Sequence, residues 1–319
     1  MSEFALIEKW FTWRDTPPNV LLGVGDDAAL LAPSQHEALV VTVDTSISGV
    51  HFPNNTPAHA VGYKSLAVNL SDLAAMGAKP LWFTLALTLP EANQQWLNEF
   101  AQGLQAAAKP HQIFLVGGDT TRGSLSITIQ VIGSVPADQA LLRSGAQIGD
   151  VIAVSGTLGD AAAGLACHQQ RLYLPTADAN YCLQRLHYPT PRLALGKVLK
   201  NIASSCIDIS DGLLADLQHI LQASQVGAQL DTNKIPFSSA LKRLKKEQRL
   251  SFALNGGDDY ELLFTIAPEK LPQLHDQAEK ISEAFSGGFS IIGTINDKKN
   301  SLKLDNNYKL SQDGYDHFR

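Results

Sequence analysis

Residues 38–45 read ALVVTVDT, a run of apolar and β-branched residues that ends on Asp and Thr. A run of this length and composition predicts a β-strand. Residues 66–73 and 96–108 instead place apolar side chains at helical spacing. Strands that alternate with helices predict an α/β or α+β layered fold. Three further predicted strands in this half are FTLALTL (83–89), IFLVGG (113–118) and LSITIQVIG (125–133).

A second set of elements begins with VIAVSG at residues 151–156, after a polar, glycine-bearing stretch at 140–150. Asp211 and Gly212 open a predicted helix, and ELLFTI (261–266) and FSIIGTI (289–295) are predicted strands. A chain of 319 residues with 45% hydrophobic content is long enough for about two domains. We expect the first at residues 1–148 and the second at 149–319.

Composition excludes several classes of partner. The net charge is −6, and no block of basic residues suits a phosphate backbone, so nucleic acid is not expected. No apolar run approaches the roughly 18 residues of a membrane-spanning helix. Cys167, Cys182 and Cys206 lack the spacing of a metal site, and we expect them to pack as reduced thiols. These features predict a cytoplasmic protein.

Acidic residues recur after apolar runs, beside Gly, Ser or Thr. In open α/β sheets, ligands bind beyond the carboxyl ends of the strands. We therefore expect these acids to stand where strands pass into loops and to line one shared cleft. They are Asp26, Asp27, Asp44, Asp72, Asp119, Asp208, Asp211, Asp258 and Asp259.

A simpler alternative is that each acid closes a turn or caps a helix. Asp is a good N-cap residue, and both Asp72 and Asp211 precede apolar helical residues. Capping does not explain why Asp with Gly, and not a mixture of Ser, Thr and Asn, recurs at six places along the chain.

Carboxylates that converge require cations. Two such charges about 4 Å apart repel by roughly 4 kcal/mol at an effective dielectric constant near 20. Oxygen ligands without a Cys or His framework select Mg²⁺ ahead of Ca²⁺, and Mg²⁺ commonly joins carboxylates to substrate phosphates. The acidic motifs therefore predict a magnesium-bound polyphosphate.

Familiar nucleotide motifs are missing. GKV at residues 196–198 lacks the upstream glycine and the following Ser or Thr of a P-loop. GVGDDA at residues 23–28 fits a dinucleotide pattern, but its acids would face a pyrophosphate and Pro33 would end the helix. Arg122 and Arg143 could clamp phosphate oxygens, and His51 either contacts substrate or packs.

Eight motifs follow one another along nearly the whole chain: GVGDDAALL (23–31), TVDTSISGVHF (42–52), AVNLSDLAAMGA (67–78), LVGGDTTRG (115–123), RSGAQIGD (143–150), IDISDGL (207–213), GGDDYEL (256–262) and GYDHF (314–318). Together they resemble the thiamine-monophosphate kinase family, within the superfamily of enzymes similar to aminoimidazole-ribonucleotide synthase. The resemblance implies a PurM-like two-domain architecture: a strand-rich N-terminal domain whose mixed sheet is covered by helices, and an α/β C-terminal domain.

The resemblance also implies a function. Members of this family phosphorylate thiamine phosphate to thiamine diphosphate with ATP and Mg²⁺, the last step of thiamine diphosphate biosynthesis, and they form homodimers through the N-terminal domain. Because the acceptor phosphate is already ionised near neutral pH, direct in-line transfer of the γ-phosphoryl group needs no general base, and catalysis rests on positioning and charge neutralisation.

Carried over by motif, the resemblance assigns residues to roles. The implied magnesium ligands are Asp27, Thr42, Asp44, Asp72, Asp119, Asp208 and Asp211. Gly118, Asp119, Arg143 and Ser210 would hold ATP, and His51, Asp258 and Tyr315 would contact thiamine phosphate. Asp44, Asp72, Arg143 and Asp211 are expected to carry catalysis.

Two positions depart from the family pattern. Val43 stands where Thr is frequent, so that only its backbone could bind metal, and Asp258 stands where Glu is also common. Two alternatives remain open: another ATP-dependent enzyme of the superfamily, or a non-catalytic sensor of magnesium-bound nucleotide. A selenophosphate synthetase would carry a reactive Cys near its amino terminus, whereas the first cysteine here is Cys167.

Overall fold

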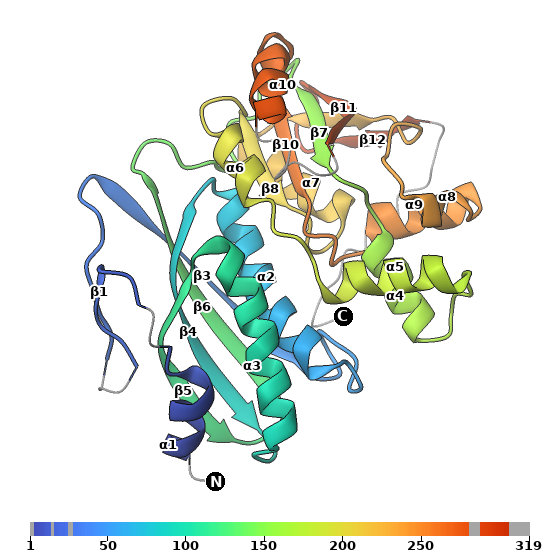
Figure 1. The fold of residues 1–319 in the computed structure, drawn as a ribbon. Helices are drawn as coiled ribbons and strands as arrows, with labels where there is room; N and C mark the ends of the chain where they lie inside the picture. Colours follow the sequence, from blue (N-terminus) through green and yellow to red (C-terminus); the bar gives the residue numbers. More distant parts are fainter. Residues whose placement is uncertain (1–2, 14–15, 25–27, 281–287, 306–319) are drawn as a thin grey trace. The chain divides into compact units, whose positions relative to one another are not determined.

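The structure is a computed structural model, and it describes residues 3–13, 16–24, 28–280 and 288–305. The chain divides into two compact units. One comprises Met1–Leu73 with Ala78–Asp138, and the other comprises Ala74–Gly77 with Gln139–Arg319. Both combine helices with a β-sheet, which confirms the mixed α/β fold expected from the sequence (Figure 1).

The first unit is built on a four-stranded mixed sheet in the order β3-β6-β4-β5. Strands β4 and β5 run parallel, and the other neighbouring pairs are antiparallel. Its elements are α1 (Glu3–Leu6), the π-helical segment η1 (Ile7–Phe11), β1 (Val20–Leu22), β2 (Leu30–Leu31), β3 (Glu37–Ile47), α2 (Ala58–Ala75), β4 (Lys79–Leu89), α3 (Gln94–Ala108), the 3₁₀ turn η2 (Lys109–His111), β5 (Phe114–Arg122) and β6 (Ser126–Pro136).

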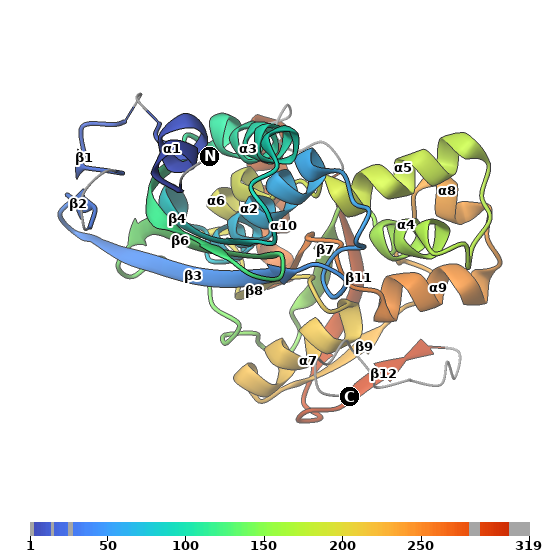
Figure 2. The same ribbon diagram turned by 90° about the horizontal axis from the view of Figure 1, so that it is seen from below.

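Helices α2 and α3 lie on the same face of this sheet (Figures 1 and 2). Asn93 caps α3, because its side-chain oxygen accepts the backbone N–H groups of Gln95 and Trp96. The helix buries Phe100 and Leu104 against the sheet side of the unit. This covering leaves the residues of β3 on two different faces, one under the helices and one exposed.

The second unit holds a six-stranded sheet in the order β12-β9-β11-β7-β10-β8. Only β12 and β9 pair in parallel; the other neighbours are antiparallel. Its elements are β7 (Val151–Ser155), α4 (Asp160–His168), α5 (Thr176–His187), α6 (Leu193–Leu199), β8 (Ser205–Asp208), α7 (Leu213–Ser224), β9 (Gly227–Leu230), α8 (Ser239–Lys242), α9 (Lys246–Asn255), β10 (Leu262–Ile266), the 3₁₀ turn η3 (Pro268–Lys270), α10 (Leu271–Lys280), β11 (Phe289–Asn296) and β12 (Leu302–Leu304).

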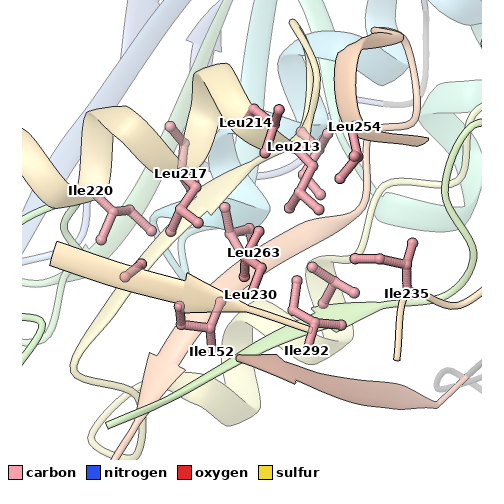
Figure 3. Packing of buried hydrophobic residues seen from close by; sticks show 14 of the residues in the cluster. Ile152, Leu213, Leu214, Leu217, Ile220, Leu230, Ile235, Leu254, Leu263 and Ile292 are labelled. Carbon is pink, nitrogen blue, oxygen red and sulfur yellow. The ribbon is translucent and has the colours of Figure 1, made fainter. Parts of the chain in front are cut away.

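The central strands of this sheet are buried on both faces. Ile152 and Val154 of β7 join one apolar cluster, while Ala153 between them joins another. In Figure 3 the leucines of α7, among them Leu213 and Leu217, pack over Leu263 and Ile152 of the sheet. A strand covered on both sides reads as a continuous apolar run, which is why VIAVS and LLFTI are visible in the sequence.

None of the helices in the described part of the chain combines the length and apolar character that crossing a bilayer requires.

Candidate active site

Strand β3 and helix α2 bring the first group of predicted site residues together. Exposed and half-buried residues alternate along β3, and Thr42 and Asp44 fall on the half-buried set. Asp44 lies opposite Ile129 of β6, a fully buried residue, so both side chains point to the helix-covered face. There the hydroxyl of Thr42 donates a hydrogen bond to Oδ2 of Asp72 at 2.6 Å.

Burial shifts the titration of Asp44. Desolvation and, to a smaller extent, the negative charge of Asp72 raise the pKa of its carboxyl from 3.8 to about 6. Two carboxylates that oppose each other's ionisation form a site that a cation would stabilise. The donors present, two carboxylates and a hydroxyl, are all oxygen, and this set suits a hard divalent ion such as Mg²⁺.

The described residues do not bring three or more acidic, His or Cys side chains close enough to make a complete metal cage. Asp44 and Asp72 with Thr42 could therefore supply only part of a metal's ligand shell, and water or substrate oxygens would have to complete it. Asp26 and Asp27 lie outside the described residues.

Gly118 lies within β5, as predicted, and Asp119, which was expected in the loop after the strand, lies within β5 as well. Strand pairing with β4 continues past Gly118 to Arg122, which places Asp119 opposite Ala86. Gly118 has a φ of +153°, and an added Cβ would meet the carbonyl oxygen of Leu85 at 1.9 Å. Only glycine fits there, so the close approach of the two strands requires this residue whatever its role toward ATP. The side chain of Asp119 is exposed.

His51 lies in the turn that follows β3. Its Nδ1 accepts the backbone N–H of Ile47 at 3.0 Å. Acceptance at Nδ1 means that a neutral ring carries its proton on Nε2, which makes that nitrogen a hydrogen-bond donor. A donor of this kind suits an anionic substrate group.

In the second unit, the predicted residues Ser210 and Asp211 form a loop between β8 and α7, and Asp208 ends β8. The conformation of this loop is stabilised by the carboxylate of Asp216, a residue that no sequence motif had indicated. Oδ2 of Asp216 accepts the backbone N–H groups of Ser210, Asp211 and Gly212, each at 3.1 Å. The pKa of Asp216 is raised to about 7, because burial and, to a smaller extent, the charge of Asp211 raise it by more than the three N–H groups lower it.

A second loop, which carries Asp258, is bonded to the first. The N–H of Asp258 donates to the carbonyl of Ser210, and the N–H of Tyr260 donates to the carbonyl of Ile209. The Tyr260 hydroxyl donates to Oδ1 of Asp258 at 3.1 Å. Asp258 and Tyr260 have positive φ values of 70° and 50°, an uncommon conformation for residues with side chains. Such backbone is retained where neighbouring contacts enforce it.

Arg143 is exposed on the segment before β7, whose backbone is anchored on both sides. The carbonyl of Arg143 accepts the hydroxyl of Ser224, and the carbonyl of Leu142 accepts the N–H of Cys206. Arg122 is also exposed, and its Nε donates to the carbonyl of Pro90 at 3.3 Å. The backbone of Arg143 is therefore fixed by hydrogen bonds while its side chain is exposed. A guanidinium on a fixed backbone suits the bidentate binding of phosphate oxygens.

The capping alternative is wrong for both residues to which it was applied. Asp72 lies near the end of α2, a helix that begins at Ala58, and so it cannot be an N-cap. The N-cap of α7 is Gly212, with a φ of +117°, and not Asp211. Tyr315, the third predicted substrate contact, lies outside the described residues.

A buried charge cluster also escaped the sequence reading. Glu261 is fully buried and accepts hydrogen bonds from Arg185 at 2.7 Å and from Arg192 at 2.5 and 2.6 Å. The hydroxyl of Ser155 donates to the same carboxylate at 2.5 Å. Next to it, Asp259 accepts the N–H of Gly159, and burial raises the pKa of Asp259 well above its usual value. The only hint in the sequence is the acidic run DDYE after two glycines.

Comparison with known proteins places the chain in a family. Residues 25–135 match the model of AIR synthase related protein, N-terminal domain, and residues 147–305 match the corresponding C-terminal domain. Thiamine-monophosphate kinase of Escherichia coli strain K12 is 46% identical over 325 residues, which cover 99% of this chain and 98% of that protein.

Solved structures agree. A crystal structure of thiamine-monophosphate kinase from Stenotrophomonas maltophilia K279a is 48% identical, with a TM-score of 0.86 over 96% of this chain and 97% of that one. AaThiL complexed with AMPPCP and TMP is 30% identical, with a TM-score of 0.79 over 90% of this chain and 89% of that one. The chain belongs to the thiamine-monophosphate kinase family, within the AIR synthase related proteins.

Proposed function

We propose that this protein transfers the γ-phosphoryl group of ATP to thiamine phosphate, giving ADP and thiamine diphosphate. The observation that carries the proposal is a sequence identity of 46% with thiamine-monophosphate kinase of E. coli, over 325 aligned residues that cover 99% of this chain. The related structure that holds AMPPCP and TMP has the same fold. The reaction is the last step of thiamine diphosphate biosynthesis.

The residues of the first unit suit a magnesium-dependent reaction. Asp44 and Asp72, with the hydroxyl of Thr42, would hold Mg²⁺, and Asp27 and Asp119 are the further ligands proposed there. In the second unit the proposed ligands are Asp208 and Asp211. When bound, Mg²⁺ neutralises the charge of the phosphate oxygens. The raised pKa of Asp44 supports this assignment, because a cation would favour its ionised form.

The chain's own groups bind and orient the two substrates. The Arg143 guanidinium would clamp phosphate oxygens of ATP, together with Gly118, Asp119 and Ser210. His51 and Asp258 would contact thiamine phosphate, with Tyr315. Asp44, Asp72, Arg143 and Asp211 are the proposed catalytic residues, and they act on charge and alignment. No side chain has to remove a proton, because the acceptor phosphate is already ionised.

We also propose a homodimer formed through the uncovered face of the first unit's sheet. Leu39, Val41, Val43 and Ile47 of β3 are 47%, 55%, 59% and 39% exposed, although all four are apolar. Val41 pairs with Ile132 of β6, which extends the apolar face to the next strand. A second copy packing sheet against sheet would cover these side chains. Val41→Asp should then yield monomers in sedimentation experiments, whereas an unchanged dimer would contradict this interface.

We propose that the two domains comprise residues 1–148 and 149–319. The first domain would hold the dimer contacts and most of the metal ligands. Cys167, Cys182 and Cys206 are free thiols, in keeping with a reducing compartment, and we propose the cytoplasm.

A product assay tests the function. The protein is mixed with ATP, Mg²⁺ and thiamine phosphate, and ADP and thiamine diphosphate are separated by chromatography. We expect both products in equal amounts, and none with Asp44→Asn. Nucleotide binding without product would instead support the sensor alternative, and ADP formed without thiamine diphosphate would support another enzyme of the superfamily.

A further inference from the structure

The contact that carries this inference lies at the start of α7. Asp216 is 2% exposed and belongs to the first turn of the helix. One oxygen of its carboxylate accepts three N–H groups from consecutive residues, Ser210 to Gly212. The backbone N–H of Asp216 in turn donates to the carbonyl of Gly212 at 3.0 Å. Side chain and backbone together therefore bind both polar groups of Gly212.

These contacts determine which groups of the loop before α7 can bind a ligand. N–H groups at the start of a helix normally attract an anion, such as the phosphate of a nucleotide. Here the three N–H groups that lead into the helix, those of Ser210, Asp211 and the N-cap Gly212, are already bound by an internal carboxylate. The side chains of this loop that the proposed function assigns to ATP and Mg²⁺ are the hydroxyl of Ser210 and the carboxylate of Asp211, and such oxygen groups favour a metal-bound nucleotide over a bare phosphate.

The same carboxylate supports the second loop indirectly, because the second loop is hydrogen-bonded to the loop that Asp216 binds. The carbonyl of Ser210 accepts the N–H of Asp258, and the carbonyl of Ile209 accepts the N–H of Tyr260. The carbonyl of Glu261 accepts the N–H of Ile209 in return. If the segment from Ile209 to Gly212 changes its curvature, these bonds cannot all persist. The position of Asp258 thus depends on the loop that Asp216 holds.

We propose that Asp216 is a positioning residue of the kinase: by binding three successive N–H groups it sets the loop from Ser210 to Gly212 to receive a magnesium-bound nucleotide. The inference rests on the proposed function, since it assumes that Ser210 and Asp211 act on MgATP. It assigns Asp216 no contact with substrate.

Three variants test this role. Asp216→Leu removes the acceptor, and Asp216→Asn keeps one amide oxygen in nearly the same place. Leu217→Ala is the matched control, because Leu217 is the neighbouring residue of α7, is fully buried in the apolar core and does not bond the loop. Binding of AMPPCP with Mg²⁺ is measured by calorimetry, and amide hydrogen exchange of residues 209–213 is measured by mass spectrometry.

We expect Asp216→Leu to weaken binding of MgAMPPCP about tenfold or more, because three N–H donors lose their shared acceptor, and to speed exchange in residues 209–213. Asp216→Asn should restore affinity to within about threefold of the wild type. Leu217→Ala should lower the melting temperature while leaving affinity and loop exchange unchanged below the transition.

Two results would overturn the role: wild-type affinity in folded Asp216→Leu, or an equal loss of affinity in Leu217→Ala, which would reduce Asp216 to a contributor to stability. If Asp216→Leu does not fold, we compare Asp216→Asn with Asp216→Ser, because the side chain of Ser is too short to reach the loop. Equal affinities of these two variants for MgAMPPCP would refute the proposal. Failure of the proposed function is recognised separately, because the wild-type protein would then bind MgAMPPCP without forming thiamine diphosphate.

Discussion

Replacing Asp44 with Asn should stabilise the metal-free protein while abolishing the kinase reaction. Asp44 lies on the half-buried face of β3, and burial together with the charge of Asp72 raises its pKa from 3.8 to about 6. When the pKa of a carboxyl is higher in the folded than in the unfolded chain, its ionisation lowers the free energy of unfolding and so destabilises the folded state. Asn has nearly the same shape and never ionises, so the variant avoids this cost.

The magnitude follows from the two pKa values. A change from 3.8 to about 6 corresponds to ~3 kcal/mol of unfolding free energy. The penalty is absent below the unfolded pKa, grows as the pH rises through the interval between the two values, and is constant above the folded pKa. The variant should therefore exceed the wild type by up to ~3 kcal/mol at about pH 8, and by almost nothing at about pH 4.

Thermal denaturation in EDTA measures this difference, and a rise in Tm on the order of 5–10 °C is expected at about pH 8. Added Mg²⁺ should reverse the order, because it stabilises only the protein that keeps both carboxylates. Asp138→Asn, at an exposed position of the same unit, is the matched control and should have no effect. An Asp44→Asn variant that melts at or below the wild-type temperature at about pH 8, or whose advantage persists at about pH 4, would refute the reasoning.

Three further predictions concern the second unit. Arg143→Ala should raise KM for ATP about tenfold or more, because a charge-assisted hydrogen bond to phosphate is lost, and should leave KM for thiamine phosphate nearly unchanged. Steady-state kinetics measure both constants, and equal effects on the two would contradict the role of Arg143 as a phosphate clamp. Leu263→Ala empties a fully buried position of β10 and should cost about 2–5 kcal/mol in urea unfolding, with normal kinase rate per folded molecule. Glu261→Gln leaves the half-buried Arg185 and Arg192 without their buried anion and should cost about 3–5 kcal/mol in the same assay. A change below about 1 kcal/mol would show that the cluster contributes little.

Local sequence was a good guide to the existence of elements and a poorer guide to their ends. The pattern at residues 38–45 predicted a strand, and β3 extends from Glu37 to Ile47. Asp44 was expected at a strand exit, yet Thr45 and Ser46 continue to pair with Thr128 and Ile127. Where pairing stops is decided by a partner strand more than eighty residues away, which no local pattern records.

The same limit explains the error at Asp72. Asp before Leu, Ala and Ala fits a helix start, but α2 begins at Ala58 and its apolar face is buried, so the helix continues past Asp72 to Ala75. Asp216 escaped notice for the opposite reason. An acid in the first turn of a helix is common, and only the folded loop shows that its oxygen accepts three N–H groups.

By itself the sequence determined the layered fold and the likeness to a kinase family, and it predicted oxygen ligands, because periodicity, composition and motif order are properties of the chain read along its length. Tertiary structure alone decided that Thr42 and Asp44 face Asp72, that Asp216 binds the loop at Ser210 and that Glu261 holds two arginines. Each of these contacts joins side chains or backbone groups whose spacing depends on how strands and helices pack, and it is this packing that sets their burial and, with it, their charge.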